Sequence, residues 1–348
     1  MVKDALKVLN KELNLQPVTE TEILKVLYRL VMQDSIVVEE NRVYITQQHQ
    51  EEEDTASMIA RKLHERIPVL TIEKELEEAQ EDLNITLSEQ QKEAVRMVFA
   101  NPISIITGGP GTGKTTTTQG IIAAYRSFGL KILLAAPTGR AAKRMTEATG
   151  LEAKTIHRLL ECKPPEGYQK NEDNPLDGDV LIIDECSMID MILMNALLKA
   201  IPEGMRLILV GDIDQLPSVG AGNVLRDIID SGVFPVVRLT RIFRQAQSSR
   251  IIMNAHAINE GKFPDISNGK NTDFFYIEKE DPEEAVQEIV RLVKNNLPRY
   301  YKTPWNHIQV LTPMQKGIVG AANLNLALQE ALNPQGDGLR RGGYLFRT

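Results

Sequence analysis

The sequence predicts an α/β fold built on parallel sheets, one complete and one partial, with helices covering both faces. From residue 87 onward, short apolar segments alternate with helical stretches, which is typical of buried parallel strands joined by helices. These segments are Ile103–Ile106, Lys131–Ala135, Val180–Ile183, Arg206–Val210 and Val236–Leu239. A second region, residues 238–348, restarts the alternation with Phe274–Ile277 and Ile308–Leu311. Because these are too few strands for a whole sheet, we expect the second sheet to be partial.

The composition is that of an ordinary soluble protein. The chain has 348 residues, of which 42% are hydrophobic and 25% charged, and it is long enough for about two or three domains. No apolar run is long enough to cross a bilayer, and the N-terminus lacks the pattern of a signal peptide. Cys162 and Cys186 are too few for a disulfide framework or a metal-ligand cluster. We expect a cytoplasmic protein without a membrane partner.

The charge balance limits the ways in which this chain could bind nucleic acid. Its formal net charge is −7, which argues against a bulk electrostatic grip on a polyanion. A local groove with a few well-placed contacts can still track phosphates. The acidic runs before residue 87 are expected to be solvated helix faces.

Residues 1–48 predict a small winged-helix-like domain. Leu6–Leu13 has helical spacing, Thr19 is placed to cap a second helix, and alternating apolar residues over 36–45 predict a hairpin. Modules of this layout either bind nucleic acid or only pack against neighbours, and both options stay open here because the region has few basic residues. Residues 49–86 should connect this domain to the sheet. The expected connecting helices are Ala56–Ile67 and Ile72–Leu83.

Residues 108–115 match the phosphate-binding pattern G-x-x-x-x-G-K-[ST]. They follow a predicted strand and begin a helix that ends near Gly129, which is the context the pattern requires. In such a loop, backbone N–H groups converge on phosphate oxygens, Lys114 brings a positive charge, and Thr115 offers a hydroxyl to Mg²⁺. A glycine-rich turn without a ligand is the weaker alternative, so we expect ATP and Mg²⁺ here. The residues expected around the nucleotide are Gly109, Pro110, Gly111, Thr112, Gly113, Lys114, Thr115 and Thr116.

A pair of acids, Asp184 and Glu185, follows the apolar strand Val180–Ile183. Beside a phosphate loop, this is the arrangement in which Asp184 holds the Mg²⁺ shell and Glu185 orients and deprotonates the attacking water. Two exposed acids at the end of a strand would be the alternative if the loop were absent.

Several further segments follow in a characteristic order. They are Leu87–Ala94, Ala136–Ala142, Thr155–Leu160, Asp184–Met188, Val210–Gly220, Leu239–Gln245 and Leu311–Gly317. Taken in order, they resemble the motifs of superfamily-one helicases of the RecD type, the exodeoxyribonuclease V alpha-subunit family, and above all its stand-alone branch. The resemblance runs from about residue 87 to the end. It implies two RecA-like units of the P-loop NTPase fold, domain 1A over residues 87–237 and a partial domain 2A over 238–348.

The resemblance also implies roles for polar residues that would otherwise be ordinary surface or capping groups. Gln91 would read the adenine, and Gln215 would sense the γ-phosphate. Arg244 would be the arginine finger, reaching the γ-phosphate and stabilising the transition state.

A track of DNA contacts is implied at the edge of the sheet. Its members would be Thr138, Gly139, Arg140, Thr155, His157 and Thr312. The first three lie where a strand passes into a helix, a place suited to a DNA phosphate. His157 could equally be a hydrogen-bonded core histidine. The aromatic fraction of 5% favours tracking of the DNA backbone over base stacking.

Residues 162–176 form a polar insertion with turn-forming residues. In RecD-like helicases this position carries a small hairpin, a pin at the duplex junction, and we expect one here. An ordinary surface loop is the alternative.

The function implied is that of a monomeric ATP-dependent DNA helicase motor, which moves 5′ to 3′ on single-stranded DNA in recombination and repair. Two alternatives stay open: a nucleotide-dependent DNA-binding adaptor on the same fold, and a RecD subunit that acts only within a RecBCD-like exonuclease complex. The last helicase motifs, including a second arginine, would lie beyond Thr348. We therefore expect this chain to bind ATP–Mg²⁺ but to hydrolyse it weakly and not to unwind DNA.

Overall fold

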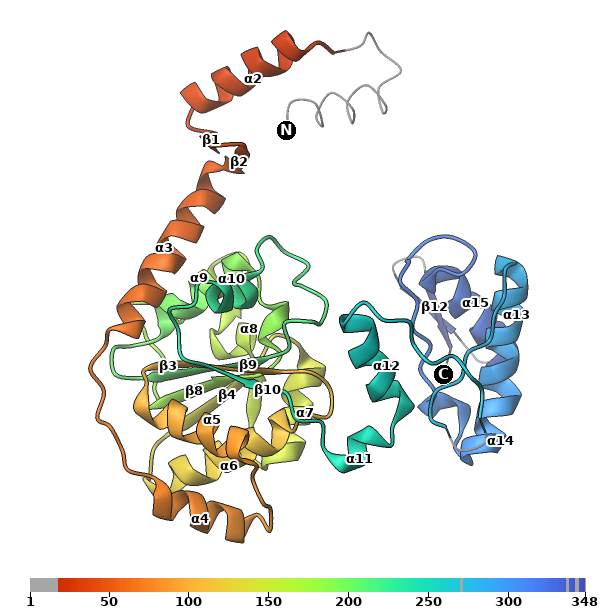
Figure 1. The fold of residues 1–348 in the computed structure, drawn as a ribbon. Coiled ribbons are helices and arrows are strands. Elements are labelled where there is room, and N and C mark those ends of the chain that lie inside the picture. Colours follow the sequence, from red (N-terminus) through yellow and green to blue (C-terminus); the bar gives the residue numbers. More distant parts are fainter. Residues whose placement is uncertain (1–17, 270–271, 336–337, 342–343, 348) are drawn as a thin grey trace. The chain divides into compact units, whose positions relative to one another are not determined.

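The computed structural model describes residues 18–269, 272–335, 338–341 and 344–347. The chain divides into two compact units, Met1–Asp265 and Ile266–Thr348 (Figure 1). This division falls later than the boundary after residue 237 that the sequence suggests, because α11 (Arg244–Gln247) and α12 (Arg250–Asn259) belong to the first unit. The predicted helix Leu6–Leu13 lies outside the described residues.

The described part of the N-terminal region contains a helix and a hairpin. Helix α2 (Glu20–Met32) begins after Thr19, whose hydroxyl accepts a hydrogen bond from the Glu22 N–H at 3.4 Å. The Glu22 carboxylate accepts one in return from the Thr19 N–H at 2.8 Å. Strands β1 (Ile36–Glu39) and β2 (Arg42–Ile45) pair antiparallel. The predicted cap at Thr19 is therefore confirmed as a reciprocal capping box.

Helix α3 (Thr46–Leu63) connects the hairpin to the sheet. It begins before Ala56, the start that the sequence suggests. Its first turns are polar and carry no apolar periodicity, so the sequence does not mark them as helical. They are held from outside: the side-chain amide of Asn195 in α9 (Met191–Ala200) donates to the carbonyl oxygen of Glu51 at 3.1 Å.

A parallel sheet of six strands forms the centre of the first unit, in the order β10-β3-β9-β8-β4-β5. Its strands are β3 Ile103–Gly108, β4 Ile132–Ala136, β5 Ala153–Thr155, β8 Val180–Ile183, β9 Arg206–Gly211 and β10 Val236–Leu239. The predicted α/β class and the predicted complete parallel sheet are confirmed. Strand β5, at the edge, was not predicted.

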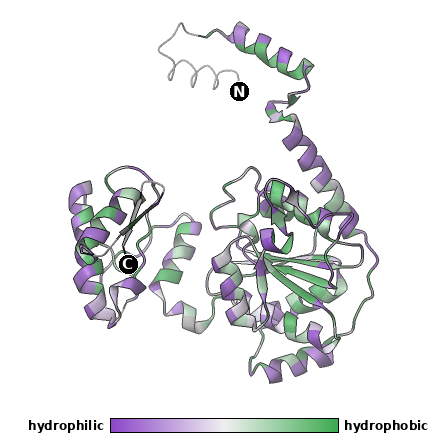
Figure 2. Cartoon of the chain, turned by 180° about the vertical axis from the view of Figure 1, so that it is seen from behind, coloured by the Kyte–Doolittle hydropathy of each residue, from purple (hydrophilic) through white to green (hydrophobic). Residues whose placement is uncertain are grey.

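Helices cover both faces of this sheet. One face carries α4 Glu73–Asp82, α5 Glu89–Ala100, α6 Lys114–Ser127 and α7 Gly139–Thr149, and the other carries α3, α8 Ile156–Leu159, α9 and α10 Val224–Asp230 (Figure 1). Successive residues of a strand face opposite sides, so Ile105 and Ile106, both 0% exposed, belong to different cores. Figure 2 shows the strands as hydrophobic along their length, as expected for a sheet buried on both faces. None of the helices in the described residues combines the length and apolar character needed to span a bilayer.

The second unit is mainly helical in its described residues. Its elements are α13 Pro282–Arg291, the π-helical turn Leu292–Asn296, α14 Leu297–Tyr301, a 3₁₀ turn Trp305–His307, α15 Ala321–Leu332 and the hairpin β11 Gly338–Arg341 with β12 Tyr344–Arg347. The strands predicted at Phe274–Ile277 and Ile308–Leu311 are not formed. Neither segment is paired with a strand among the described residues of this unit, so an apolar run alone did not produce a ladder there.

Candidate nucleotide site

Strand β3 ends at Gly108, and the phosphate loop passes directly into α6. Gly111 and Gly113 have φ of 74° and 82°, a left-handed conformation that L-residues rarely adopt. A Cβ atom on Gly113 would lie 2.6 Å from the Gln91 Nε2 and 2.9 Å from the Phe243 Cε2. Backbone conformation and crowding therefore both require glycine at position 113.

Lys114, the first residue of α6, folds back over the loop. Its ammonium donates hydrogen bonds to the carbonyl oxygens of Gly108 and, at 3.3 Å, of Gly109. The Thr112 hydroxyl also donates to Gly109, at 2.8 Å. Thr115, next along α6, is exposed. The structure thus places the predicted cation beside the loop and leaves the Thr115 side chain accessible.

Asp184 and Glu185 follow β8, whose carboxyl end lies at the same sheet edge as the phosphate loop. The Glu185 N–H donates to Asp184 Oδ1 at 2.9 Å. Burial raises the pKa of the Asp184 carboxyl, and the positive charge of Lys114 partly opposes this. Lys114 and the paired acids therefore lie at the same edge of the sheet, and the charge of Lys114 affects the pKa of both carboxyls.

Glu185 has two unusual features. Its backbone is left-handed, with φ 55° and ψ 40°, and such strain in a non-glycine residue costs about 1–3 kcal/mol. Its Oε2 is buried and has no hydrogen-bond partner among the described residues. Burial first, and then the neighbouring Asp184, raise the pKa of its carboxyl. The strained backbone thus holds an acceptor oxygen that the protein itself does not use.

Gln91 links α5 to the phosphate loop. It is 1% exposed, its Oε1 accepts from the Ser88 N–H at 2.9 Å, and its Nε2 donates to the Gly113 carbonyl at 3.2 Å. One amide N–H remains for an adenine acceptor. The observed bonds show a structural role at the loop, and adenine reading stays a prediction.

Gln215 and Arg244 are less well placed by the structure. Gln215 is exposed after β9, and its amide donates to Asp212 Oδ2 at 3.4 Å. Asp212 is 2% exposed and is one of the charges that raise the Glu185 pKa. Gln215 is therefore linked to the acids through Asp212. The backbone of Arg244 begins α11, and its side chain lies outside the described part of the structure.

Two predicted DNA-contacting threonines lie at the ends of adjacent strands. The Thr138 hydroxyl caps α7 by accepting from the Ala141 N–H at 3.2 Å, and the Thr155 hydroxyl caps α8 by accepting from the Arg158 N–H at 3.2 Å. Strands β4 and β5 pair directly, so both helix starts lie at one sheet edge. Gly139 and Arg140 are exposed at the start of α7.

The remaining DNA candidates are His157, in α8 itself, and Thr312. His157 is exposed, which excludes the core-histidine alternative, and its ring lies 5.9 Å from that of Tyr168. Tyr168 belongs to a short hairpin of β6 (Cys162–Lys163) and β7 (Gly167–Tyr168) inside the 162–176 insertion. Thr312 belongs to the second unit, where its hydroxyl donates to the Val319 carbonyl at 2.7 Å.

Three residues near the site were not singled out from the sequence. The charge of Arg144 on α7 lowers the pKa of both Asp184 and Glu185, against the larger effect of burial. Its helical spacing from Arg140 was a usable signal. Phe243 and His256 contact the phosphate loop from the segment after β10. No local pattern announces contacts between residues so far apart in the sequence.

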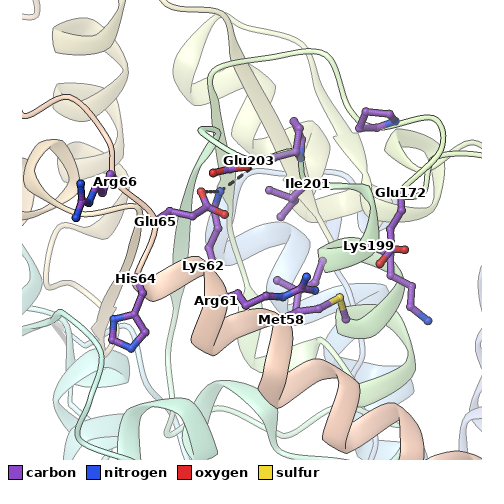
Figure 3. A pocket seen from close by; sticks show the side chains of 13 residues that line it. Met58, Arg61, Lys62, His64, Glu65, Arg66, Glu172, Lys199, Ile201 and Glu203 are labelled. Atoms are coloured by element: carbon purple, nitrogen blue, oxygen red, sulfur yellow. Dashed lines mark hydrogen bonds and ion pairs between the residues drawn. The ribbon is translucent and has the colours of Figure 1, made fainter.

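A cavity of about 770 Å³ lies elsewhere, between the end of α3 and the loops that precede β8 and β9 (Figure 3). These loops are at the amino ends of the strands, opposite the phosphate loop. Lys62 is 4% exposed there and donates to Glu65 Oε2 at 2.6 Å, as Figure 3 shows. Burial lowers the pKa of Lys62, while the hydrogen bond to Glu65 and its charge oppose this. Lys62 also donates to the Pro202 carbonyl at 3.4 Å, and Glu65 Oε2 accepts from the Gly204 N–H at 3.1 Å. These bonds tie the end of α3 to the loop before β9, outside the candidate site.

The parallel sheet, the phosphate loop and the paired acids together define a nucleotide-binding domain of the P-loop class. A sequence family described as an AAA domain matches residues 91–221. The chain is homologous to RecD-type helicases. It is 40% identical to the ATP-dependent RecD2 DNA helicase of Deinococcus radiodurans over 254 residues. This matched region covers 73% of this chain and 34% of that protein.

Two further matches, one in sequence and one in structure, show lower similarity. The RecBCD enzyme subunit RecD of Mycobacterium tuberculosis is 39% identical over 165 residues, covering 41% of this chain and 29% of that protein. The crystal structure of Pif1 helicase from Candida albicans shares 22% identity, with a TM-score of 0.41 over 61% of this chain and 56% of that one. The chain spans about a third of the length of the curated relatives named here.

Proposed function

We propose that this chain carries the ATP-hydrolysing motor of a RecD-type DNA helicase. The observation that carries the proposal is the meeting, at the carboxyl edge of one parallel sheet, of Lys114 on its phosphate loop with Asp184 and Glu185. Open parallel sheets bind ligands at this edge. The homology to RecD2 and RecD supports a motor over other nucleotide-binding proteins on the same fold.

The triphosphate would lie on the N–H groups of residues 109–115, with Lys114 exchanging its loop carbonyls for phosphate oxygens. Magnesium would be held by the exposed Thr115 hydroxyl and the Asp184 carboxylate. Mg²⁺ binds through one or two protein ligands together with phosphates and water, and it would neutralise charge on the phosphates.

Glu185 is the residue that would activate water. Its partnerless Oε2 is an acceptor for a water hydrogen, and a raised pKa strengthens the carboxylate as a base. Gln215 would sense the γ-phosphate through Asp212, and Arg244 would supply the arginine finger. Gln91 would read the adenine with its remaining N–H.

Single-stranded DNA would cross the same edge at the ends of β4 and β5. Thr138 and Thr155 lie there with the exposed Gly139 and Arg140, and the exposed His157 extends the line toward the hairpin. Thr312 would contribute from the second unit. These contacts suit phosphates more than bases, since the residues are small, polar or cationic.

Nucleotide binding is the first test. Isothermal titration of this chain with an ATP analogue that resists hydrolysis, in the presence of Mg²⁺, should show one site. Lys114→Ala should abolish that binding, while Lys143→Ala, on the exposed face of α7, should leave it unchanged. Equal affinity in the wild-type protein and Lys114→Ala would refute the site.

Motor activity is the second test. ATP hydrolysis should rise with single-stranded DNA, and Thr138→Val together with Thr155→Val should reduce that stimulation more than the basal rate. Strand displacement by a full-length version, on substrates with opposite overhangs, should succeed only with a 5′ overhang. In that full-length version, deleting residues 164–166 at the hairpin tip should abolish unwinding and spare DNA-stimulated hydrolysis; loss of both would show that the hairpin is not a pin.

Partner dependence is the third test. A motor that works alone should keep DNA-stimulated hydrolysis as a purified monomer. Stable co-purification with nuclease subunits, and activity only in their presence, would instead favour a RecBCD-like subunit.

A further inference from the structure

Residues 243–259, called here the clamp segment, contact the backbone of the phosphate loop and form hydrogen bonds with it. The Phe243 N–H donates to the Gly111 carbonyl at 3.2 Å. The His256 Nε2 lies 3.0 Å from the Pro110 carbonyl oxygen. Two consecutive carbonyls of the loop are therefore held by a segment that follows the sheet in sequence.

The contact is close because the loop residues are glycines. A Cβ atom on Gly109 would lie 2.7 Å from the His256 Cε1, and one on Gly111 would lie 2.5 Å from the Ala246 Cβ. The imidazole thus packs directly on backbone. A carbonyl oxygen can only accept, so the His256 Nε2 must carry the hydrogen of this bond.

Holding these carbonyls sets the direction of the neighbouring N–H groups. In a trans peptide unit the C=O and the N–H point in opposite directions, and the only cis bond in the described residues is Pro164–Pro165. Fixing the Pro110 and Gly111 carbonyls toward the clamp segment therefore turns the N–H groups of Gly111 and Thr112 to the other side. That is the side on which a phosphate loop receives its anion.

The clamp segment is itself anchored. Asn254, 4% exposed, donates from its amide to the Asp265 carbonyl at 2.9 Å and accepts from the Asp265 N–H at 2.8 Å. Asp265 is the last residue of the first unit. The helix that carries His256 is thus fixed at its far side as well as on the loop.

We infer that His256 is a positioning residue for the nucleotide phosphates: its Nε2–H holds the Pro110 carbonyl so that the loop amides are directed at the anion before it binds. The inference rests on the proposed nucleotide site and adds a residue that touches the loop and not the ligand. Preorganised donors bind more tightly because less ordering remains to be done on binding.

The test uses the chain with two probes, ADP and inorganic pyrophosphate, each titrated calorimetrically with Mg²⁺. The amide nitrogen of glutamine can reach the position of a histidine Nε2, whereas that of asparagine is too short. His256→Asn and His256→Leu should weaken both probes by the same factor, about three- to tenfold, the effect of one net hydrogen bond. His256→Gln should bind within about twofold of the wild-type protein. Met253→Ala, exposed on the same helix, is the matched control.

The outcomes separate this inference from the proposed function. If the wild-type protein binds both probes and Lys114→Ala binds neither, the nucleotide site is supported. The affinities of the His256 variants then test the role of His256 by themselves. Wild-type affinity in His256→Asn or His256→Leu would overturn the inference, as would His256→Gln binding as weakly as His256→Asn. A merely structural role would not distinguish glutamine from asparagine. A wild-type protein that binds neither probe would refute the site itself, and the inference with it.

Discussion

Glu185→Gln should make the protein more stable while removing its hydrolytic activity. The side chain keeps its shape and its left-handed backbone, so the strain at φ 55° cancels between variant and wild type. What changes is the charge, since the buried Oε2 has no partner and Asp184 repels the carboxylate. A buried unpaired polar group costs about 1–3 kcal/mol, and more when it is charged. The neutral amide of glutamine keeps the first cost and loses the additional cost of the charge. Because Glu185 is only partly buried, we expect a gain at the lower end, about 1 kcal/mol.

The gain should depend on pH in a definite direction. In the folded protein the Glu185 pKa is raised above its ordinary value, so between those two values the folded state binds more protons than the unfolded state. The stability of the wild-type protein therefore falls as pH rises through that window. Glutamine does not titrate. The difference in stability should be small below about pH 4 and largest near neutrality.

Thermal unfolding without nucleotide, followed by circular dichroism from acidic to neutral pH, measures this difference. At neutral pH the variant should melt about 2–4 °C higher, the shift expected from 1 kcal/mol in a domain of this size. The matched control is Glu161→Gln, an exposed glutamate with a similar φ of 52°, which should show no such gain. A variant that is no more stable than the wild type at neutral pH, or a difference that does not grow with pH, would refute the reasoning.

Two further predictions concern the packing that supports the site. Gly113→Ala should destabilise the protein by more than Gly129→Ala, because position 113 adds crowding against Gln91 and Phe243 to the backbone strain, whereas a Cβ at position 129 meets nothing within 4 Å. Strain alone costs about 1–2 kcal/mol, so urea unfolding of both variants isolates the crowding, and only Gly113→Ala should lose nucleotide binding. Equal losses would show that the loop yields. Tyr125→Phe should cost about 1 kcal/mol, because its buried hydroxyl donates to the Val98 carbonyl at 2.7 Å at the end of α5, where Pro102 has no N–H to offer. Chemical denaturation measures this cost, with Tyr28→Phe, at an exposed tyrosine, as the control. Equal stability of the two variants would contradict the prediction.

The core of the sheet could be predicted from the sequence because its strands are buried on both faces. Val180–Ile183 is a continuous apolar run, is buried along its whole length, and has the same bounds in the structure. Val236–Leu239 also keeps its predicted bounds, although Arg238 interrupts the run and is exposed. Strand β5 was not predicted because Ala153–Thr155 is short, lies at the edge of the sheet and contains a lysine. The first turns of α3 were not predicted because the residue that binds them, Asn195, is distant in sequence.

The candidate site also contains some features that the sequence predicts and others that it does not. Lys114, Asp184 and Glu185 could be predicted because a local pattern and a strand end place them. The left-handed backbone of Glu185 and the imidazole of His256 on the loop could not be predicted. Both depend on contacts between elements that no short motif records.

The strand order has a mechanical consequence. Thr138 and Thr155 stand at the ends of β4 and β5, which are joined through β8 and β9 to the strand that carries the phosphate loop. A continuous ladder of hydrogen bonds makes that edge stiff, so the proposed DNA grip and the nucleotide cradle cannot slide past each other within this sheet. A conformational change that moves the DNA by one nucleotide must therefore take place outside the sheet, in the more flexible loops that leave it.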